Sequence, residues 1–366
     1  MASINILDYE ILTSQGDLEE SVYKIKNDES KISSRGDIPF YSFEQKIEQN
    51  QQSIYDALKK IVSKTLLKLP DESRKSTALL VGTSIIDWNL VDAINSCVYE
   101  YKKTPYTSHK TSIDTYAKNL SDEFGLNGFT MSINTACTSS ANALLEASNL
   151  INSGVVDNVI VVGLEIYSPL MSDGFYKMEL ISNTHAKPFD KNRDGLVLGE
   201  AIGAILVGKG DSKWSLLGGF SNCNSATITS VGASGDECVE VIQEALDRLN
   251  LTSKDITAIK AHATGSISND EAEINAISRV FESGVDFTAL KPYIGHTIGA
   301  SGVVEIALFM GCIDDGFIPK TLFCDESISQ THMPLNKHKE CKDGLFMCNY
   351  FGFGGNNISL VIEKKL

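Results

Sequence analysis

The sequence predicts an α/β protein in which helices cover a mostly parallel sheet. Short runs of β-branched and other apolar residues alternate along the chain with segments whose apolar residues recur at helical spacing. The 366 residues include 28 glycines but only 8 prolines, as expected for a chain with many tight turns between strands and helices. With 42% hydrophobic residues the chain can bury a large core, which excludes disordered and collagen-like proteins.

The predicted elements follow one another from the N-terminal end. The first is an amphipathic helix, because apolar residues recur at every third or fourth position between residues 51 and 69. Further helices are expected over 141–152, 236–249 and 270–281. Strands are expected over 78–81, 158–163, 201–207, 256–261 and 358–362.

Charge and cysteine content restrict the class of protein. The chain has 47 acidic and 32 basic residues, so its net charge of −15 repels nucleic acid and anionic membranes, and neither is expected as a partner. Asp8 and Glu10 lie where a signal peptide would need a basic start and an apolar run, so we expect a cytoplasmic protein. The eight cysteines form no CxxC pair and are not clustered with histidines, which argues against a zinc site and a disulfide framework.

Cys137 is the first candidate catalytic residue. It lies in the segment NTACTSSANAL, after an apolar run and at the head of a predicted helix. Free N–H groups and the helix dipole at such a position lower the pKa of a thiol and favour the thiolate nucleophile. Taken alone, a cysteine in such a small-residue helix is more often a buried structural residue than a nucleophile.

Three glycine-rich segments lie at the ends of predicted strands, where α/β folds bind their ligands. His262 opens HATGSISNDEAE, Lys291 opens KPYIGHTIGASG with His296 five residues on, and residues 350–357 are YFGFGGNN. A single histidine at a strand end is more often structural than catalytic. The three segments together with the cysteine indicate an active site.

Five motifs occur together in one order: TACTSS around Cys137, KPFDKNRDGLVLGEA at 187–201, HATGSISND from His262, the segment 291–302, and FGFGGNN. In these motifs the chain resembles the β-ketoacyl-acyl carrier protein (ACP) synthases, the condensing enzymes of fatty-acid and polyketide synthesis. The resemblance covers the chain from about residue 129 to its C-terminal end. It implies a thiolase-like fold of two similar βαβ halves in a layered αβαβα arrangement.

The resemblance also implies the boundary of the halves. The N-terminal half, 1–209, would carry the nucleophilic cysteine, and the C-terminal half, 210–366, the catalytic histidines. A polar, glycine-containing stretch at 208–215 agrees with a boundary there.

The resemblance implies a role for each site residue. Cys137 would attack an acyl thioester, with an oxyanion hole formed by its own main-chain N–H group and that of Phe353. His262 and His296 would stabilise the enolate formed when malonyl-ACP loses CO₂. Neither a metal nor an organic cofactor is implied, because decarboxylation drives the condensation.

Three of the implied roles concern residues around this centre. Lys291 would tune the electrostatics of the histidine pair. Glu273 would be the structural carboxylate partner of His262. Phe353 would also lie where elongating synthases have a gate to the acyl pocket.

The implied partners are acyl- and malonyl-loaded ACP and a second synthase subunit, in a homodimer or a heterodimer. A Cys-His-His set indicates an elongating synthase, since synthases that start chains use one histidine and one asparagine. A catalytically idle, chain-length-determining subunit is the alternative function. Cys348 lies four residues before Gly352 and does not match the second cysteine of thiolases.

The chain also departs from the family. Residues 99–127 look shortened, and Ala263 stands where the family usually has glycine. Short, diverged synthases of this kind occur in type II polyketide and aryl-polyene pathways. Lys102, Lys103 and Lys110 form a basic cluster before the nucleophile, which we expect to contact the acidic carrier protein.

Overall fold

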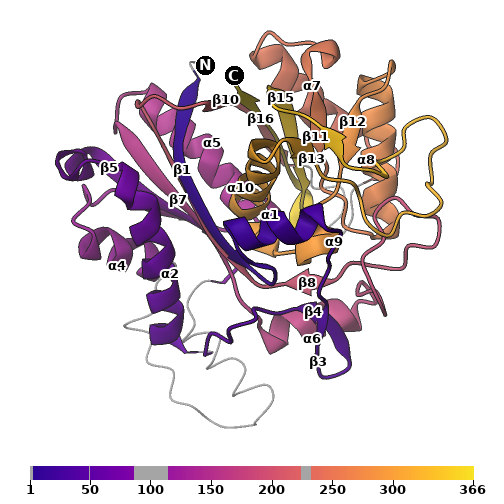
Figure 1. Cartoon of the computed structure of the whole chain (residues 1–366), viewed down its shortest axis with the longest axis horizontal. Helices are drawn as coiled ribbons and strands as arrows, with labels where there is room; N and C mark the ends of the chain where they lie inside the picture. Colours follow the sequence, from indigo (N-terminus) through magenta and orange to yellow (C-terminus); the bar gives the residue numbers. More distant parts are fainter. Residues whose placement is uncertain (1–2, 49, 86–113, 224–231) are drawn as a thin grey trace.

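A computed structural model describes residues 3–48, 50–85, 114–223 and 232–366. Within these ranges eleven strands form one sheet, whose main path runs β12-β11-β15-β16-β10-β1-β9-β7-β5-β6, with β2 paired to β1. β1 and β10 join the two parts of the sheet through three residue pairs, from Ile4↔Leu216 to Ile6↔Trp214. Figure 1 shows the two parts on either side of two central helices.

The two parts of the sheet have the same topology. The strands of the first part are β1 (Ile4–Thr13), β5 (Thr77–Thr83), β6 (Thr130–Ile133), β7 (Asn158–Glu165) and β9 (Ala201–Gly208). Those of the second are β10 (Trp214–Cys223), β11 (Ala258–Lys260), β12 (Asp286–Thr288), β15 (Gly344–Phe351) and β16 (Asn356–Lys364). Numbered along the chain, each part has the strand order 3-2-4-5-1. This repeat confirms the predicted fold of two similar halves, while the boundary between residues 209 and 210 stays a prediction.

The prediction of a mostly parallel sheet is wrong, because the sheet is mixed. In each half the second strand pairs in parallel with the third and the fourth. The fifth strand runs antiparallel to the fourth and to the first. A strand that is buried on both faces has the same apolar composition in either direction, so the sequence pattern could not show which way the later strands run.

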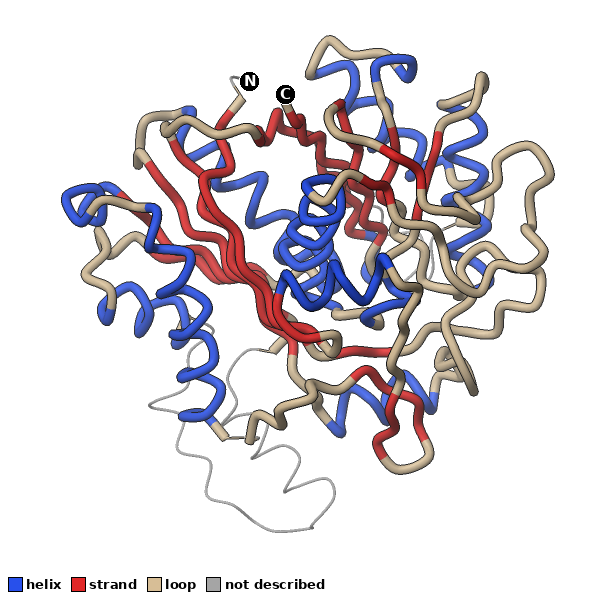
Figure 2. Tube along the Cα trace, viewed as in Figure 1, coloured by secondary structure: helices blue, strands red, loops and turns tan. Residues whose placement is uncertain are grey.

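Helices form three layers around the sheet. The central layer is α5 (Ser139–Asn152) and α10 (Ser301–Asp314). The outer layer of the first half is α2 (Gln51–Thr65) and α4 (Thr115–Glu123), and that of the second is α7 (Asp236–Arg248) and α8 (Ile267–Val280). Figure 2 shows α5 and α10 enclosed between the strands. All predicted helices and strands are present, with ends that differ by a few residues.

The remaining elements are short and lie at the edges of these layers. They are α1 (Leu18–Lys26), α6 (Pro169–Lys177), α9 (Lys291–Ile294), β2 (Gly16–Asp17), β3 (Ser33–Arg35), β4 (Ile38–Tyr41), β8 (Leu198–Gly199), β13 (Phe317–Ile318) and β14 (Lys339–Glu340). The 3₁₀ helices include Ala136–Thr138, Ile298–Ala300 and Phe353–Gly355. No helix within the described ranges is long and apolar enough to cross a membrane.

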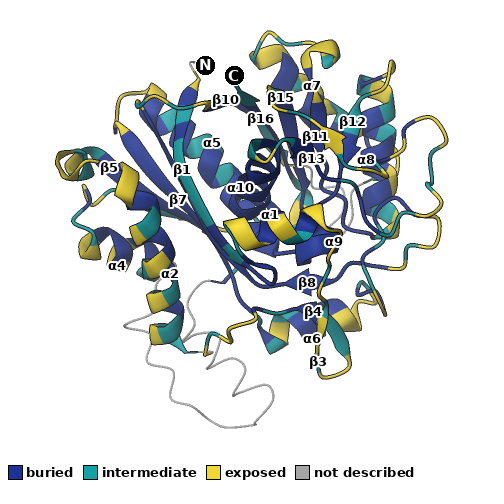
Figure 3. Cartoon of the chain, in the orientation of Figure 1, coloured by how far each residue is buried: buried dark blue, intermediate teal, exposed yellow. Residues whose placement is uncertain are grey.

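Alternation along the strands divides the core into separate layers. In β5, Leu80 packs toward the central helices, whereas Leu79 and Val81 pack against α2 and α4. In α10 every residue from Ser301 to Ile313 is buried, so this helix is covered on all sides (Figure 3). The two parts of the sheet therefore enclose α5 and α10 between them.

The two central helices begin in the same way. The 3₁₀ helix Ala136–Thr138 leads into α5, and the 3₁₀ helix Ile298–Ala300 leads into α10. The helices are in contact at their first turns, where the N–H group of Val303 donates to the hydroxyl of Ser140 over 3.1 Å. This crossing brings the start of α5 next to the loop that precedes α10.

Candidate active site

Cys137 lies at the junction of β6 and α5, as the sequence predicts. It is the middle residue of the 3₁₀ helix, and the residue before it, Ala136, has φ +54°, in the left-handed region. The main-chain N–H groups of Cys137 and Phe353 both face Sγ. Two N–H donors at one buried sulfur form the arrangement expected of an oxyanion hole.

His296 contacts the sulfur directly. Its Nε2 lies 3.1 Å from Sγ of Cys137, and its Nδ1 lies 3.3 Å from the hydroxyl of Ser301. The main-chain N–H group of His296 donates to the carbonyl of Val197 over 2.7 Å, which fixes the loop between α9 and α10. Both ring nitrogens therefore have a partner, and Nε2 is placed to exchange a proton with the thiol.

The electrostatics of the thiol differ from the prediction. The position at the head of α5 predicted a lowered thiol pKa, but burial raises the pKa of Cys137 to about 11. The N–H groups of Phe353 and Cys137 and the charge of Lys291 oppose this effect without overcoming it. The resting sulfur therefore keeps its proton, and Nε2 of His296 is a base within contact distance of it.

His262 follows β11 and is fixed through its main chain. The carboxylate of Glu273, on α8, accepts hydrogen bonds from the N–H groups of His262 and Ala263, each over 2.7 Å. Burial raises the pKa of Glu273 to about 7. Glu273 is thus close to His262, as predicted, but it holds the backbone of the histidine loop and has no hydrogen bond to the ring.

Lys291 sets the orientation of the His262 ring. Its Nζ donates to the carbonyl of His262 over 2.6 Å and lies 3.3 Å from Nδ1 of the same residue. Because an ammonium can only donate, Nδ1 accepts and the ring proton lies on Nε2. The two histidine rings meet edge to face with centroids 5.4 Å apart, and Sγ of Cys137 and one nitrogen of each ring all lie within 4.8 Å of one another.

Both histidines are neutral in this environment. Burial is the main cause that lowers the pKa of each ring well below 6.5, and the positive charges of Lys291 and Lys260 act in the same direction. A neutral imidazole offers one N–H donor and one acceptor. The pair can therefore accept a proton from the thiol and donate hydrogen bonds to an oxygen.

Sequence reasoning missed three buried charged residues of this site. Glu305, on α10, accepts from Lys291 over 2.7 Å and from Lys260 over 2.6 Å. Glu165, at the end of β7, accepts from the hydroxyl of Ser84 and, over 3.0 Å, from the N–H group of Gly299. Glu305, Lys260 and Glu165 lie outside the motifs described above. A charged residue inside an otherwise apolar strand or helix is the sequence pattern that could have indicated them.

Phe353 lies at the mouth of the site and is half-buried. Its ring stacks on that of Phe175, with centroids 5.4 Å apart and planes 13° from parallel. The cavity between these rings, Cys137 and the histidines measures about 10 Å³, which is about the space of one water molecule. The described residues thus close the site around the sulfur.

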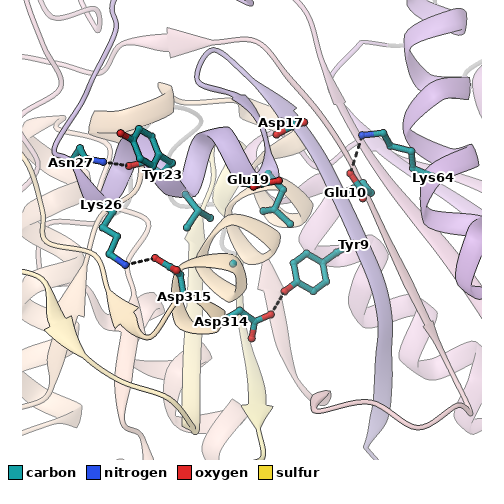
Figure 4. Close-up of a pocket in the computed structure, with 13 residues that line it drawn as sticks. Tyr9, Glu10, Asp17, Glu19, Tyr23, Lys26, Asn27, Lys64, Asp314 and Asp315 are labelled. Carbon is teal, nitrogen blue, oxygen red and sulfur yellow. Dashed lines mark hydrogen bonds and ion pairs between the residues drawn. The ribbon is translucent and has the colours of Figure 1, made fainter.

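A larger hollow of about 890 Å³ lies at the far end of α10 (Figure 4). Two ion pairs lie among its lining residues: Lys26 with Asp315 and Lys64 with Glu10. It contains none of the predicted site residues. The predicted basic cluster Lys102, Lys103 and Lys110 falls outside the described residues.

The described structure brings together all the predicted site residues: Cys137, His262, Glu273, Lys291, His296 and Phe353. A buried thiol with two N–H donors and two neutral histidines lies where two like halves meet. This fold and this site together define an acyl-transferring condensing enzyme of thiolase-like fold.

Comparison with known proteins gives the family. The model "Beta-ketoacyl synthase, N-terminal domain" matches residues 38–212, and "Beta-ketoacyl synthase, C-terminal domain" matches 215–325. The chain is similar to 3-oxoacyl-[acyl-carrier-protein] synthase 2 of Vibrio harveyi, with 29% identity over 322 residues, 81% of this chain and 78% of that protein. The chain belongs to the β-ketoacyl synthase family, which confirms the predicted resemblance.

Two solved structures share the fold over the whole chain. A β-ketoacyl synthase from Burkholderia phymatum superposes with a TM-score of 0.88 at 22% identity, covering 100% of both chains. A ketosynthase from Xenorhabdus doucetiae, solved in complex with its chain length factor, superposes with a TM-score of 0.86 at 22% identity, covering 100% of this chain and 98% of that one.

Proposed function

We propose that the protein is an elongating β-ketoacyl-ACP synthase, which joins an acyl group held on Cys137 to the two-carbon unit of malonyl-ACP. The observation that carries this proposal is the contact between Sγ of Cys137 and Nε2 of His296, made where the N–H groups of Cys137 and Phe353 face the sulfur. A nucleophile, a base and an oxyanion hole are the parts that acyl transfer needs.

Acyl transfer comes first. His296 takes the thiol proton as Sγ of Cys137 attacks the thioester carbonyl, and the N–H groups of Cys137 and Phe353 stabilise the oxyanion. The bond from the carbonyl carbon to the carrier sulfur then breaks, and the carrier leaves as a thiol with the proton from His296. The products are acyl-Cys137 and free carrier protein, and both histidines are neutral again.

Condensation follows on the acylated enzyme. Malonyl-ACP loses CO₂, and the electrons of the broken carbon–carbon bond form an enolate. Its oxygen accepts hydrogen bonds from Nε2–H of His262 and from Nε2–H of His296, in the tautomer whose Nδ1 accepts from the hydroxyl of Ser301. The enolate carbon attacks the acyl carbonyl, a new carbon–carbon bond forms, and the thiolate of Cys137 leaves. A proton from solvent restores the thiol, and β-ketoacyl-ACP is released.

Phe353 and Phe175 act as the gate of the acyl pocket in this proposal. The cavity of about 10 Å³ beside Cys137 is too small for an acyl chain, so the stacked rings must separate when a substrate enters.

The proposed partners are an acyl carrier protein and a second synthase subunit. The name of the Vibrio harveyi relative specifies a carrier protein as substrate carrier, and the Xenorhabdus doucetiae neighbour was solved with a chain length factor. Among the described strands β6 ends the sheet, and Phe129, Met131 and Ile133 on this edge are only partly buried. An apolar sheet edge of this kind supports pairing with another subunit.

Intact-mass measurement after incubation with acyl-ACP tests the proposed function. The expected result is one acyl adduct, which is lost in Cys137→Ala and retained in Cys223→Ala. Cys223 is the control because it is exposed and its Sγ contacts the carbonyl of Gly354, next to Phe353. Absence of an adduct on any cysteine, in a sample that unfolds cooperatively, would instead support the alternative of a catalytically idle subunit.

A further inference from the structure

Lys260 is a fully buried cation two residues before His262, at the end of β11. Its Nζ donates to Oε2 of Glu305 over 2.6 Å and to the carbonyl of Asn349 over 3.0 Å. It also lies 3.5 Å from the centroid of the Tyr350 ring. An ammonium has three N–H groups, and each of these three contacts can take one of them.

Lys291 uses its three N–H groups in a similar way. It donates to Oε1 of Glu305 over 2.7 Å, to the carbonyl of His262 over 2.6 Å, and toward Nδ1 of His262 over 3.3 Å. One carboxylate therefore bridges two ammonium groups, so the positive charges of these three residues outnumber the negative one when all three are ionised. A surplus charge in a dry interior is costly, so stability alone does not explain it.

We propose that Lys260 is a positioning residue of the condensing reaction, acting through Glu305 and Lys291 on the two histidines; this inference rests on the proposed function. By holding Oε2 of Glu305, Lys260 leaves only Oε1 for Lys291. The ammonium of Lys291 then keeps its other N–H groups directed at His262. The surplus positive charge of this lysine pair also favours the negative enolate that forms at the histidines.

Lys260 also affects the charge state of the histidines. Its charge is among the causes that lower the pKa of His262 and of His296. Several other titratable groups surround His262 and His296. They are Lys291 on α9, Glu305 on α10, Glu273 on α8, Tyr350 on β15 and Cys137 before α5, and Cys348 on β15 lies beside Lys260. Because all of these groups remain when Lys260 alone is replaced, the change in pH dependence isolates its charge.

The test is the pH dependence of CO₂ release from malonyl-ACP by the acylated enzyme. Lys260→Met removes the charge and keeps a side chain of similar length. One unit charge acting across about 10 Å at an effective dielectric constant of about 20 corresponds to about one pH unit. The acid limb of the pH–rate profile is the side on which protonation of the histidines slows CO₂ release. We expect this limb to move to higher pH by about one unit. We also expect kcat near pH 7 to fall about tenfold, with little change in KM.

Lys364 offers a matched control at the far end of α10. Its side chain is 10% exposed, and it too has a carboxylate, a carbonyl and an aromatic ring as partners: Asp314, Ile313 and Trp214. Lys364→Met should lower the thermal stability as Lys260→Met does. It should leave the acid limb and kcat where the parent protein has them, since it is remote from the histidines.

Two further variants keep the proposal falsifiable. Lys260→Arg retains the charge and should restore the parental acid limb. Lys260→Gln keeps a donor for Asn349 but no charge, and should show the same shift as Lys260→Met, even if the methionine variant fails to fold. An unmoved acid limb in the folded uncharged variant, or an equal shift in Lys364→Met, would overturn the role of Lys260. Failure of the parent protein to release CO₂ would instead overturn the proposed function.

Discussion

Gly302 offers a direct test of how the fold positions the nucleophile. It lies in the first turn of α10, where this helix crosses α5. A Cβ at this position would lie 2.1 Å from the main-chain nitrogen of Ala141 and 2.6 Å from its Cα, well inside the ordinary contact distance of about 3.4 Å. Because the atoms it meets belong to the backbone of α5, no side chain can move aside, and the two helices must separate by about 1 Å.

The expected cost of Gly302→Ala follows from two opposing terms. Alanine favours a helix over glycine by about 1 kcal/mol, whereas overpacking a rigid contact costs about 1–3 kcal/mol and more where only backbone can yield. A net loss of about 2 kcal/mol lowers Tm by about 3 °C in a chain of 366 residues, because the entropy of unfolding is about 2.1 cal/mol/K per residue. Separation of the helices also lengthens the contact between Cys137 and His296, and a misplacement of about 1 Å costs about 10² in rate.

Gly311→Ala is the matched control for this prediction. It lies on the same helix, but its added Cβ would meet only the side-chain ends of Val22 and Leu18, at 2.9 and 3.0 Å. We expect Gly311→Ala to unfold close to the parental Tm and to acquire the acyl adduct on Cys137 at the parental rate. Thermal unfolding and time-resolved intact-mass measurement decide the matter. Equal Tm and equal acylation rates in both variants would refute the argument that the helix crossing fixes the nucleophile.

Three other predictions concern the site. His262→Ala should lower CO₂ release about 10²-fold or more while sparing acyl transfer, whereas His296→Ala should slow both steps, because its ring contacts Sγ; identical rate profiles would contradict this. Alkylation of Cys137 by iodoacetamide should rise about tenfold per pH unit from pH 7 to 10, because its pKa is raised to about 11; a plateau below pH 8 would indicate a preformed thiolate. Burial raises the pKa of Glu165 to about 7, so the stability from its proton is present below about pH 4.5 and lost as the pH rises through 7; Glu165→Gln should flatten the fall in Tm between pH 5 and 8, and an unchanged slope would argue against it.

The sequence by itself predicted the residues that meet in the candidate active site. Cys137, His262, Lys291 and His296 each lie in a short segment whose residue types and order match the family, so no contact was needed to find them. Local patterns also gave the helices and strands, because amphipathic and apolar periodicity depends on neighbours in the chain.

Only the tertiary structure decided the direction of the later strands and the electrostatics of the site. A helix N-terminus is a local feature, and it predicted a lowered pKa for Cys137; burial by both halves of the molecule raises that pKa instead. Glu305 acquires its role because α10 brings it to Lys260, which is 45 residues away in the chain. Desolvation and pairing of charges depend on which groups meet in space, and residue order alone does not give that.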